Sequence, residues 1–215
     1  MRLYSYFRSS AAYRVRIALH LKGLDFEYVA VHLLRGGGEQ FGTAFQALSP
    51  QAQVPVLEDD GAALTQSLAI IEYLDECHPA VPLLPREPLQ RARVRALALA
   101  VACDIHPLNN LRVRRYLAER LRVDEPARNA WIQHWIRLGL DGIEAAIAAA
   151  PRAAYCAGDA PTLADCCLIP QLFNARLAGL DTGAWPNLAR IDAACQALEG
   201  FRRAHPALQP DSEGA

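Results

Sequence analysis

Lysine is almost missing from this sequence, because Lys22 is the only lysine among 22 basic residues. An arginine-rich composition explains most of the other basic residues, so only arginines that cluster bear on function. An excess of charge is also missing, since the formal net charge is -1. Nucleic acids and anionic membrane surfaces attract strongly basic proteins, so neither is expected as the main partner.

Long apolar runs and paired cysteines are missing as well. No stretch reaches the roughly 20 apolar residues that span a bilayer, and residues 1–20 show no signal-peptide pattern. The six cysteines include no C-x-x-C pair, and a chain with a good core does not need disulfides, so we expect reduced thiols in the cytoplasm. Cys103 and His106 supply only two neighbouring ligands, so no metal site is predicted.

Apolar residues are plentiful, at 52% against 21% charged, which allows a sizeable core in a chain of 215 residues. That length suits one large domain or two small ones. In the first third, alternating and helical spacings predict a βαβ unit followed by a ββα unit. The predicted elements are strands 2–7, 26–33, 54–58 and 62–65, helices 11–22 and 67–77, and a helical turn at 43–48.

A proline-rich stretch separates this part from the rest of the chain. Residues 78–88, HPAVPLLPREP, contain four prolines, which break regular structure. Helical spacing then continues nearly to the end, in blocks 89–120, 124–149, 163–178 and 187–204. We therefore predict an α/β domain over residues 1–78, a linker over 79–88 and an all-α domain over 89–215.

Three local patterns predict particular structures. Pro55 cannot donate to a strand ladder, so the Val54-Pro55 bond at the head of a strand is a candidate cis bond. The Ser67 hydroxyl is expected to cap the helix over 67–77. Thr162 and Asp165 form a capping-box pattern before an apolar helix, which serves folding rather than chemistry.

The first helix begins within the stretch YSYFRSSAAYRVRIALHLKG, residues 4–23. Two serines and the arginines Arg8, Arg14 and Arg16 surround its first turns. A buried structural helix does not need these groups, so we interpret the cluster as an anion site. From the residues alone, a serine here is also simply an N-cap. Arg14 and Arg16 cannot share a helix face, so one is expected to be solvated or salt-bridged.

Several segments together resemble the zeta-class glutathione transferases, the class that includes maleylacetoacetate isomerase and bacterial maleylpyruvate isomerase. RSSAAYRVRIAL is similar to the SSC-x-W-R-V-R-I-A-L signature of that class. Similar segments follow in the family's order across nearly the whole chain: GGGEQF, ALSPQAQVPVLE, QSLAIIEYLDE, CDIHPLNNLRV and PTLADCCLIPQL. Ala11 and Tyr13 stand where the signature often has cysteine and tryptophan, so position 11 offers no thiol for redox or covalent chemistry.

The resemblance implies the glutathione transferase fold, with a thioredoxin-like βαβ-ββα domain followed by a helical bundle, and it implies a homodimer. It also implies glutathione as the cofactor. A free thiol is mostly protonated at neutral pH, and a helix N-terminus favours its thiolate. Ser9 matches the family's first serine and is predicted to donate a hydrogen bond to the sulfur. Ser10 and Arg8 are the other catalytic candidates.

The resemblance extends the predicted glutathione site to other segments. The helix start at Gln66-Ser67 would hold the γ-glutamyl carboxylate, and the backbone of Val54 would pair with the cysteinyl unit as an added strand does. Gln40 would reach the glycyl end, with Gln53 a weaker candidate. The predicted glutathione-binding residues are Ser9, Ser10, Ala11, Gln40, Gln53, Val54, Gln66, Ser67, Asp104, His106, Asn110 and Arg112.

The family's substrates carry two acidic groups around a cis double bond, so a small dicarboxylate-like substrate is expected. Guanidinium groups bind carboxylates through paired hydrogen bonds, which makes Arg8, then Arg112 and Arg176, the substrate-binding candidates. The implied mechanism is reversible addition of the thiolate to the alkene, rotation about the resulting single bond, and elimination to the trans isomer. Arginine would stabilise the enolate that develops.

Three functions remain open from the sequence. The first is isomerisation of maleylacetoacetate or maleylpyruvate in tyrosine or aromatic-acid catabolism, and the sequence does not separate these two substrates. The second is a zeta-like transferase that acts on α-haloacids. The third is a glutathione-binding module without turnover, against which the serine pair and nearby arginines count.

Overall fold

The computed structural model describes residues 1–212 and divides the chain into two compact units. The first unit comprises residues 1–84 together with the end of the chain from Gln196, and the second comprises Pro85–Cys195. Each unit has its own architecture, which is described separately below.

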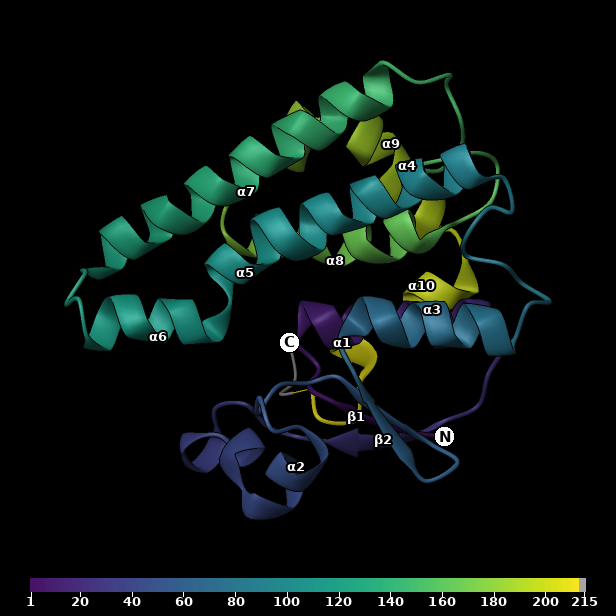
Figure 1. Cartoon of the computed structure of the whole chain (residues 1–215). Helices are drawn as coiled ribbons and strands as arrows, with labels where there is room; N and C mark the ends of the chain where they lie inside the picture. Colours follow the sequence, from purple (N-terminus) through teal and green to yellow (C-terminus); the bar gives the residue numbers. More distant parts are fainter. Residues whose placement is uncertain (213–215) are drawn as a thin grey trace. The chain divides into compact units, whose positions relative to one another are not determined.

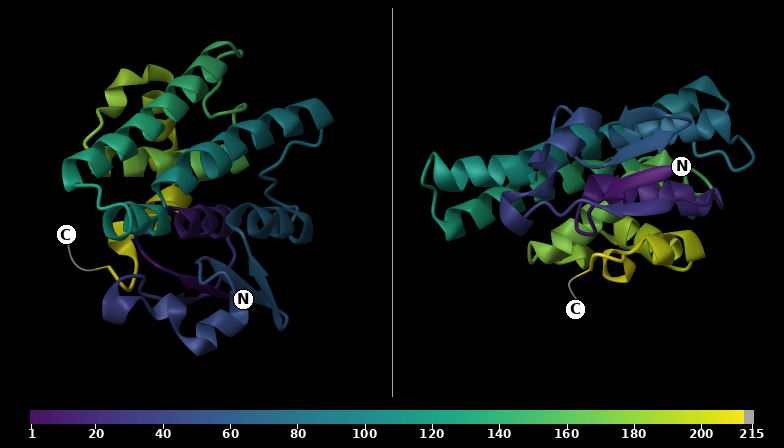
Figure 2. Two further views of the ribbon diagram at one scale, coloured as in Figure 1. Left: turned by 60° about the vertical axis from the view of Figure 1, so that its left-hand side comes forward. Right: turned by 90° about the horizontal axis from the view of Figure 1, so that it is seen from below.

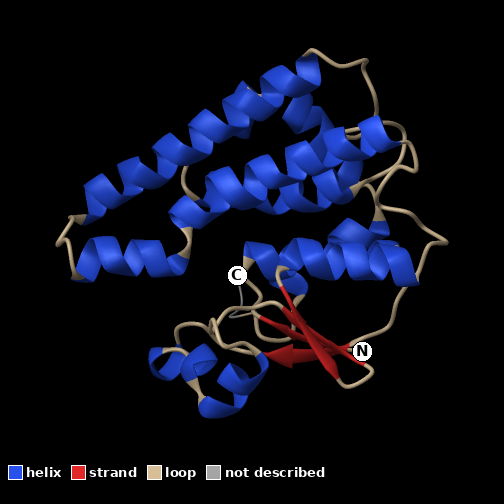
Figure 3. Ribbon diagram, in the orientation of Figure 1, coloured by secondary structure: helices blue, strands red, loops and turns tan. Residues whose placement is uncertain are grey.

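A four-stranded sheet forms the centre of the first unit (Figures 1 and 3). Its strands are β1 (Arg2–Ser5), β2 (Glu27–Ala30), β3 (Val56–Asp59) and β4 (Ala62–Thr65), in the order β2-β1-β3-β4. β1 pairs with β2 in parallel and with β3 antiparallel, and β3 pairs with β4 antiparallel. The predicted βαβ-ββα order is therefore confirmed, although the first two strands are shorter than predicted.

Three helices accompany this sheet: α1 (Ser10–Leu21), α2 (Thr43–Leu48) and α3 (Ser67–Cys77). α1 and α3 pack side by side because both bury an apolar stripe, which in α1 includes the fully buried Val15, Ala18 and Leu19. Lys22, at the end of α1, connects this helix to the end of α3. Its Nζ atom donates to Asp75 Oδ1 at 2.7 Å and to the carbonyl oxygen of His78 at 3.0 Å.

The end of the chain returns to the first unit. Helix α10 (Glu199–Ala204) packs against α1, as the adjacent yellow and purple ribbons in Figure 2 show. Gly200 permits this approach, because a Cβ atom there would lie 3.1 Å from the backbone nitrogen of Leu21. A short 3-10 turn over Pro206–Leu208 follows. The predicted helical block 187–204 is not continuous, because one helix ends at Gln196 and α10 begins at Glu199.

The second unit is helical. Its helices are α4 (Pro88–Leu99), a π-helical turn over Ala100–Ile105, α5 (His106–Asn109), α6 (Leu111–Glu119), α7 (Glu125–Ala148), α8 (Leu163–Leu177) and α9 (Pro186–Gln196). The predicted block 89–120 is thus broken, because Pro107 cannot donate a backbone hydrogen bond and Asn110 is extended, with ψ 151°. None of the described helices is long and apolar enough to cross a bilayer.

The capping box at the start of α8 is confirmed. The backbone nitrogen and Oγ1 of Thr162 donate to Asp165 Oδ2 at 2.8 and 2.9 Å. The other carboxylate oxygen accepts from the backbone nitrogen of Cys156 at 2.9 Å. Asp165 is fully buried, and this burial raises its pKa. Its hydrogen bonds serve to fix the helix start, as the sequence predicts.

Candidate active site

Four segments with predicted site residues lie at the same end of the sheet in the first unit, the end at which β1 and β2 finish. β1 and β2 are parallel, so both finish at this end, while the antiparallel β3 begins there and β4 finishes there. Val56 pairs with Tyr4 on one side and with Thr65 on the other. The segment before β3 therefore lies between the segment after β1, which carries Arg8 to Ser10, and the start of α3.

The first helix begins with a turn that presents Ser9. The backbone nitrogen of Ser9 donates to the carbonyl oxygen of Tyr6 at 2.9 Å, and Ser9 Oγ accepts from the backbone nitrogen of Ala12 at 3.2 Å. Ser9 is thus the N-cap of α1. Since its oxygen faces the helix, its hydroxyl hydrogen is directed elsewhere and is available to a ligand. The first turn contains no acidic residue, so the positive end of the helix dipole is not neutralised.

The interpretation of all three nearby arginines as an anion site is wrong for Arg16, which is fully buried. Its Nε atom donates to the carbonyl oxygen of Ala204 at 3.1 Å, and its Nη2 atom to that of Phe7 at 3.1 Å. Its Nη1 atom donates to Ser5 Oγ at 3.1 Å and to the carbonyl oxygen of Tyr6 at 3.3 Å. Burial lowers the pKa of Arg16 to about 10, so it remains charged at neutral pH. Arg16 therefore holds the turn in place.

Arg14 is also buried, with 2% of its surface exposed, and its Nη1 atom donates to Ser67 Oγ at 3.2 Å. Neither Arg14 nor Arg16 is solvated, so of the two expected arrangements a salt bridge is the one that stays a prediction. The predicted capping role of Ser67 is wrong as well, since the N-cap of α3 is Gln66 and Ser67 is the first helical residue. The backbone of Gln66 has φ +70°, a value that residues other than glycine rarely adopt.

The Val54-Pro55 bond is cis, as the sequence predicts. Val54 precedes β3, and its backbone N–H and C=O have no hydrogen-bond partner among the described residues. The backbone of Gln53, in contrast, is engaged twice by Ser49 Oγ, at 3.0 and 3.3 Å. Val54 therefore offers a free edge to an extended peptide, as a strand edge does.

Gln40 lies within the glycine-rich loop rather than on the surface, with 4% of its surface exposed. Its Nε2 atom donates to the carbonyl oxygen of Leu33 at 3.4 Å, while its buried Oε1 atom has no hydrogen-bond partner among residues 1–212. Gln40 therefore braces the loop that follows β2, and its contact with a ligand stays a prediction.

The remaining predicted site residues belong to the second unit. Asp104 is exposed on the π-helical turn, His106 begins α5, and Asn110 caps α6 by accepting from the backbone nitrogen of Arg112 at 2.9 Å. The Arg112 side chain is exposed. Arg176 forms an ion pair with Asp192 at 2.8 Å. The relation of these residues to the turn at Ser9 stays a prediction.

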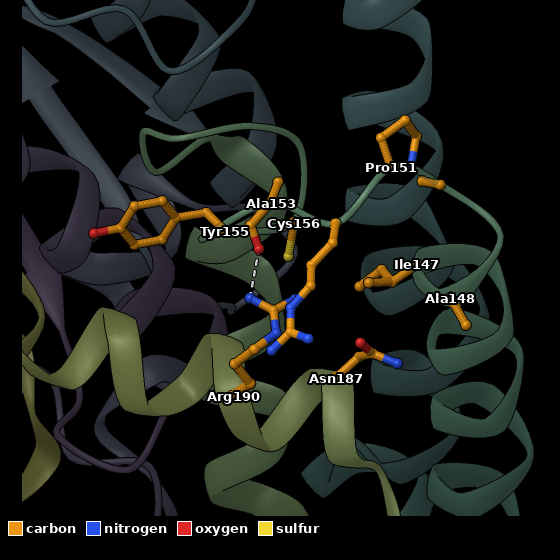
Figure 4. Close-up of a pocket in the computed structure, with 10 residues that line it drawn as sticks. Ile147, Ala148, Pro151, Ala153, Tyr155, Cys156, Asn187 and Arg190 are labelled. Atoms are coloured by element: carbon orange, nitrogen blue, oxygen red, sulfur yellow. Dashed lines mark hydrogen bonds between the residues drawn. The ribbon is translucent and has the colours of Figure 1, made fainter.

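A small pocket in the second unit contains none of the predicted site residues (Figure 4). It has a volume of about 140 Å³ and lies between α9 and the loop that follows α7. Arg190 donates to the carbonyl oxygens of Ala153 and Ala154 and so ties this loop to α9. Burial raises the pKa of the Cys156 thiol well above its usual range, so the pocket holds no ready nucleophile.

Sequence reasoning missed Asp211, which reaches the turn at Ser9 from the other end of the chain. Its Oδ2 atom accepts from the backbone nitrogen of Phe7 at 3.1 Å, and its Oδ1 atom accepts from the hydroxyl of Tyr28 at 2.6 Å. No local pattern could have found this residue, because its partners lie 204 and 183 positions away.

Comparison with known proteins agrees with this geometry. The family model described as "Glutathione S-transferase, N-terminal domain" matches residues 3–82, and "Glutathione S-transferase, C-terminal domain" matches residues 125–210. Maleylpyruvate isomerase of a Ralstonia species is 50% identical over 213 residues, which cover 99% of this chain and 100% of the relative. The holo structure of a maleylpyruvate isomerase, described as a bacterial zeta-class glutathione S-transferase, has a TM-score of 0.95 at 50% identity and covers 99% of this chain and 100% of its own.

The chain belongs to the zeta-class glutathione transferases. The predicted glutathione transferase fold is thereby confirmed. A second zeta-like structure, maleylacetoacetate isomerase from Methylobacterium extorquens AM1 with bound malonate and GSH, has a TM-score of 0.95 at 42% identity and covers 100% of both chains. The role of the turn at Ser9 in the chemistry of this family stays a prediction.

Proposed function

We propose that this zeta-class transferase catalyses the glutathione-dependent cis–trans isomerisation of a maleyl keto acid, either maleylacetoacetate or maleylpyruvate, in aromatic-acid or tyrosine catabolism. The observation that carries the proposal is the turn at Ser9 in a chain that is 50% identical, over nearly its full length, to a maleylpyruvate isomerase. The serine hydroxyl and the start of α1 offer hydrogen-bond donors and positive potential at one point.

Glutathione fits the residues at this edge of the sheet. When bound, it supplies a thiol that serves as nucleophile toward the cis double bond once it is deprotonated. Ser9 would donate its hydroxyl hydrogen to the sulfur while its oxygen still accepts the hydrogen bond from the backbone nitrogen of Ala12. Ser10 and Ala11 contribute through the first turn of α1, whose N–H groups favour a negative charge.

Other residues hold the peptide part of glutathione. The unpaired backbone of Val54 supports pairing with an extended peptide. The start of α3 at Gln66 and Ser67 suits the γ-glutamyl carboxylate. Gln40 and Gln53 are weaker candidates, since one is buried and the other is bonded to Ser49. From the second unit we include Asp104, His106, Asn110 and Arg112.

Arginine is proposed to bind the carboxylates of the substrate. Arg8 is exposed, directly before Ser9, and its guanidinium has no recorded partner among the described residues, as is true of Arg112. Arg176 is the weakest candidate because Asp192 already engages it. A structural relative with both GSH and malonate, a dicarboxylate, supports a substrate of this class.

We also propose that the protein is a homodimer in the cytoplasm. The family resemblance supports the dimer, and all six cysteines are free, which suits a reducing compartment. A zeta-like transferase for α-haloacids would use the same thiolate, but no contact in the described residues favours it over the isomerase.

The test is an absorbance assay with freshly generated maleylpyruvate and maleylacetoacetate, each with and without catalytic glutathione. Turnover that needs glutathione without consuming it is expected for one of the two substrates. Consumption of glutathione in step with product would favour a conjugating transferase. Glutathione binding without turnover of either substrate would favour a haloacid transferase or a non-catalytic module.

Two serine variants sharpen this assay. Ser9→Ala is expected to lower kcat about 100-fold and to shift the activity to higher pH, because the thiolate loses a hydrogen-bond donor. Ser10→Ala is the matched control on the same turn and is expected to have a smaller effect. A larger loss in Ser10→Ala than in Ser9→Ala would reverse the assignment of the two hydroxyls.

A further inference from the structure

The turn that carries Arg8 and Ser9 is held from both sides, by Arg16 of the helix that follows it and by Asp211, which is distant in the sequence. Phe7 donates its backbone N–H to Asp211 Oδ2 at 3.1 Å, and its carbonyl oxygen accepts from Arg16 Nη2 at 3.1 Å. Arg16 is fully buried, so its side is fixed by the core. Asp211 comes from the last described residues of the chain, so its side depends on how that segment is held.

The segment that presents Asp211 is itself folded. Gln209 is buried, and its Nε2 atom donates to the carbonyl oxygens of Arg203 and His205 at 2.9 and 2.8 Å. The backbone nitrogen of Ser212 donates to the carbonyl oxygen of Gln209 at 3.0 Å. Asp211 therefore lies inside a hydrogen-bonded turn over residues 209–212, which follows directly on the anchored side chain of Gln209.

Tyr28 provides the second anchor for this carboxylate. Its hydroxyl donates to Asp211 Oδ1 at 2.6 Å, and Tyr28 lies on β2 next to Leu3 of β1. Burial, followed by the hydrogen bond to Asp211, raises the pKa of Tyr28, so its hydroxyl remains protonated and can donate. The two carboxylate oxygens thus connect the central sheet to the turn.

The position of Phe7 controls where Ser9 points. Tyr6 to Ser9 form a tight turn closed by the 2.9 Å bond from the nitrogen of Ser9 to the carbonyl oxygen of Tyr6, with Phe7 and Arg8 between them. A rotation of the backbone at Phe7 would move Arg8 and the Ser9 hydroxyl together. A displacement of about 1 Å at a reacting group can lower a rate by roughly 100-fold.

We propose that Asp211 is a positioning residue for the thiolate site, acting through the N–H group of Phe7 on the orientation of Ser9. The inference rests on the proposed role of Ser9, but the two are separable by experiment. It assigns a function to the end of the chain, which follows the helical segments yet completes the first unit.

The test compares Asp211→Ala with Asp211→Asn. An asparagine amide can accept from Phe7 through its oxygen and donate to the Tyr28 hydroxyl through its nitrogen, so it can restore both contacts, whereas alanine restores neither. Asp211→Ala is expected to speed amide hydrogen exchange at residues 7–9 about tenfold in protein without glutathione. It is also expected to raise the pKa of the bound thiol, followed by thiolate absorbance, by about one unit and to lower kcat about tenfold.

Asp211→Asn is expected to recover most of each change. Ser212→Ala is the matched control, since only the backbone of Ser212 is bonded there, and it should leave all three readouts unchanged. Normal exchange and a normal thiol pKa in folded Asp211→Ala would overturn the proposal. If that variant does not fold, Tyr28→Phe decides: faster exchange at Phe7 supports the proposal, and unchanged exchange rejects it.

Ser9→Ala, measured in parallel, separates the two assignments. If Ser9→Ala leaves the thiol pKa unchanged, the role of Ser9 is wrong, whatever Asp211→Ala does. If Ser9→Ala raises the thiol pKa while Asp211→Ala does not, only the positioning role of Asp211 fails.

Discussion

The turn over residues 6–9 and the segment over residues 103–112 both carry predicted site residues, but they are built in different ways. The turn is fixed by the buried Arg16 and by Asp211, and it exposes little besides Arg8 and Ser9. The other segment is a π-helical turn followed by a four-residue helix, and Asp104 and Arg112 are exposed.

Under the proposed function, this difference predicts a division of labour: residues 6–9, the fixed region, would bind the thiolate, and residues 103–112, the adaptable region, would recognise the substrate. Stabilising a thiolate requires donors at fixed positions, which a network of buried hydrogen bonds provides. Recognition of one keto acid among similar ones can instead use exposed side chains, which can change without disturbing the core. π-Helical turns are frequent at functional sites, which agrees with the predicted role of residues 103–112.

The largest expected effect comes from removing the anchor of the fixed region. Arg16→Met leaves the carbonyl oxygens of Phe7 and Ala204 without their donor inside the core. We expect the free energy of unfolding to fall by about 4 kcal/mol, since each unpaired buried group costs about 1–3 kcal/mol. Urea denaturation measures this change. Arg2→Met, at an exposed ion pair with Glu27, is the control and should change stability by less than about 1 kcal/mol.

An equal loss of unfolding free energy in Arg16→Met and Arg2→Met would mean that Arg16 does not hold the turn. A loss of stability in Arg16→Met together with normal glutathione affinity would separate the fold from the site. In that case the hydrogen bonds around residues 6–9 would serve stability alone and would not position the glutathione site.

The next largest effect is expected on catalysis, with stability unchanged. Arg8→Ala is expected to lower kcat/KM for the maleyl substrate about 100-fold, because it removes a paired contact to a carboxylate beside the sulfur. Arg112→Ala, in the adaptable region, should lower it about tenfold, mainly through KM. Arg176→Ala is the control and should change it less than about twofold, since Asp192 already binds that guanidinium. Steady-state kinetics and thermal unfolding are measured on all three.

An equal loss in Arg8→Ala and Arg176→Ala would contradict the order of these arginines. A larger effect on kcat from Arg112→Ala than from Arg8→Ala would place the carboxylate that takes up charge near the adaptable region.

Local rules predicted much of the fold and less of the site. The bounds of α3 agree with the prediction over 67–77, and the capping box at Thr162 formed as expected, because both depend on neighbours in the sequence. The break in the block 89–120 did not follow from periodicity. It depends on Pro107, which cannot donate a backbone hydrogen bond, and on the extended backbone of Asn110, two local features that the apolar spacing does not register.

Long-range partners explain what sequence reasoning missed at the site. Arg16 looked like a ligand for an anion because its burial depends on the end of α10, where its acceptor at Ala204 lies 188 residues away. Its other acceptors, at residues 5 to 7, are near in sequence but follow no pattern of spacing. Ser67 looked like a cap because its partner, Arg14, lies on another helix. Serine at the start of α1 was correctly placed from the sequence, since an N-cap is a local signal.

The smallest expected effect tests the adaptable region. Asn110 caps α6 through its bond to the nitrogen of Arg112, so Asn110→Ala should reduce stability by about 1 kcal/mol and increase amide exchange over residues 111–114. Asn110→Asp keeps the acceptor and is the matched control. Because Arg112 lies in the first turn of α6, loss of the cap should raise KM a fewfold while kcat stays unchanged. A fall in kcat with unchanged KM would show that this segment positions reacting groups, and the distinction between a fixed and an adaptable region would no longer hold.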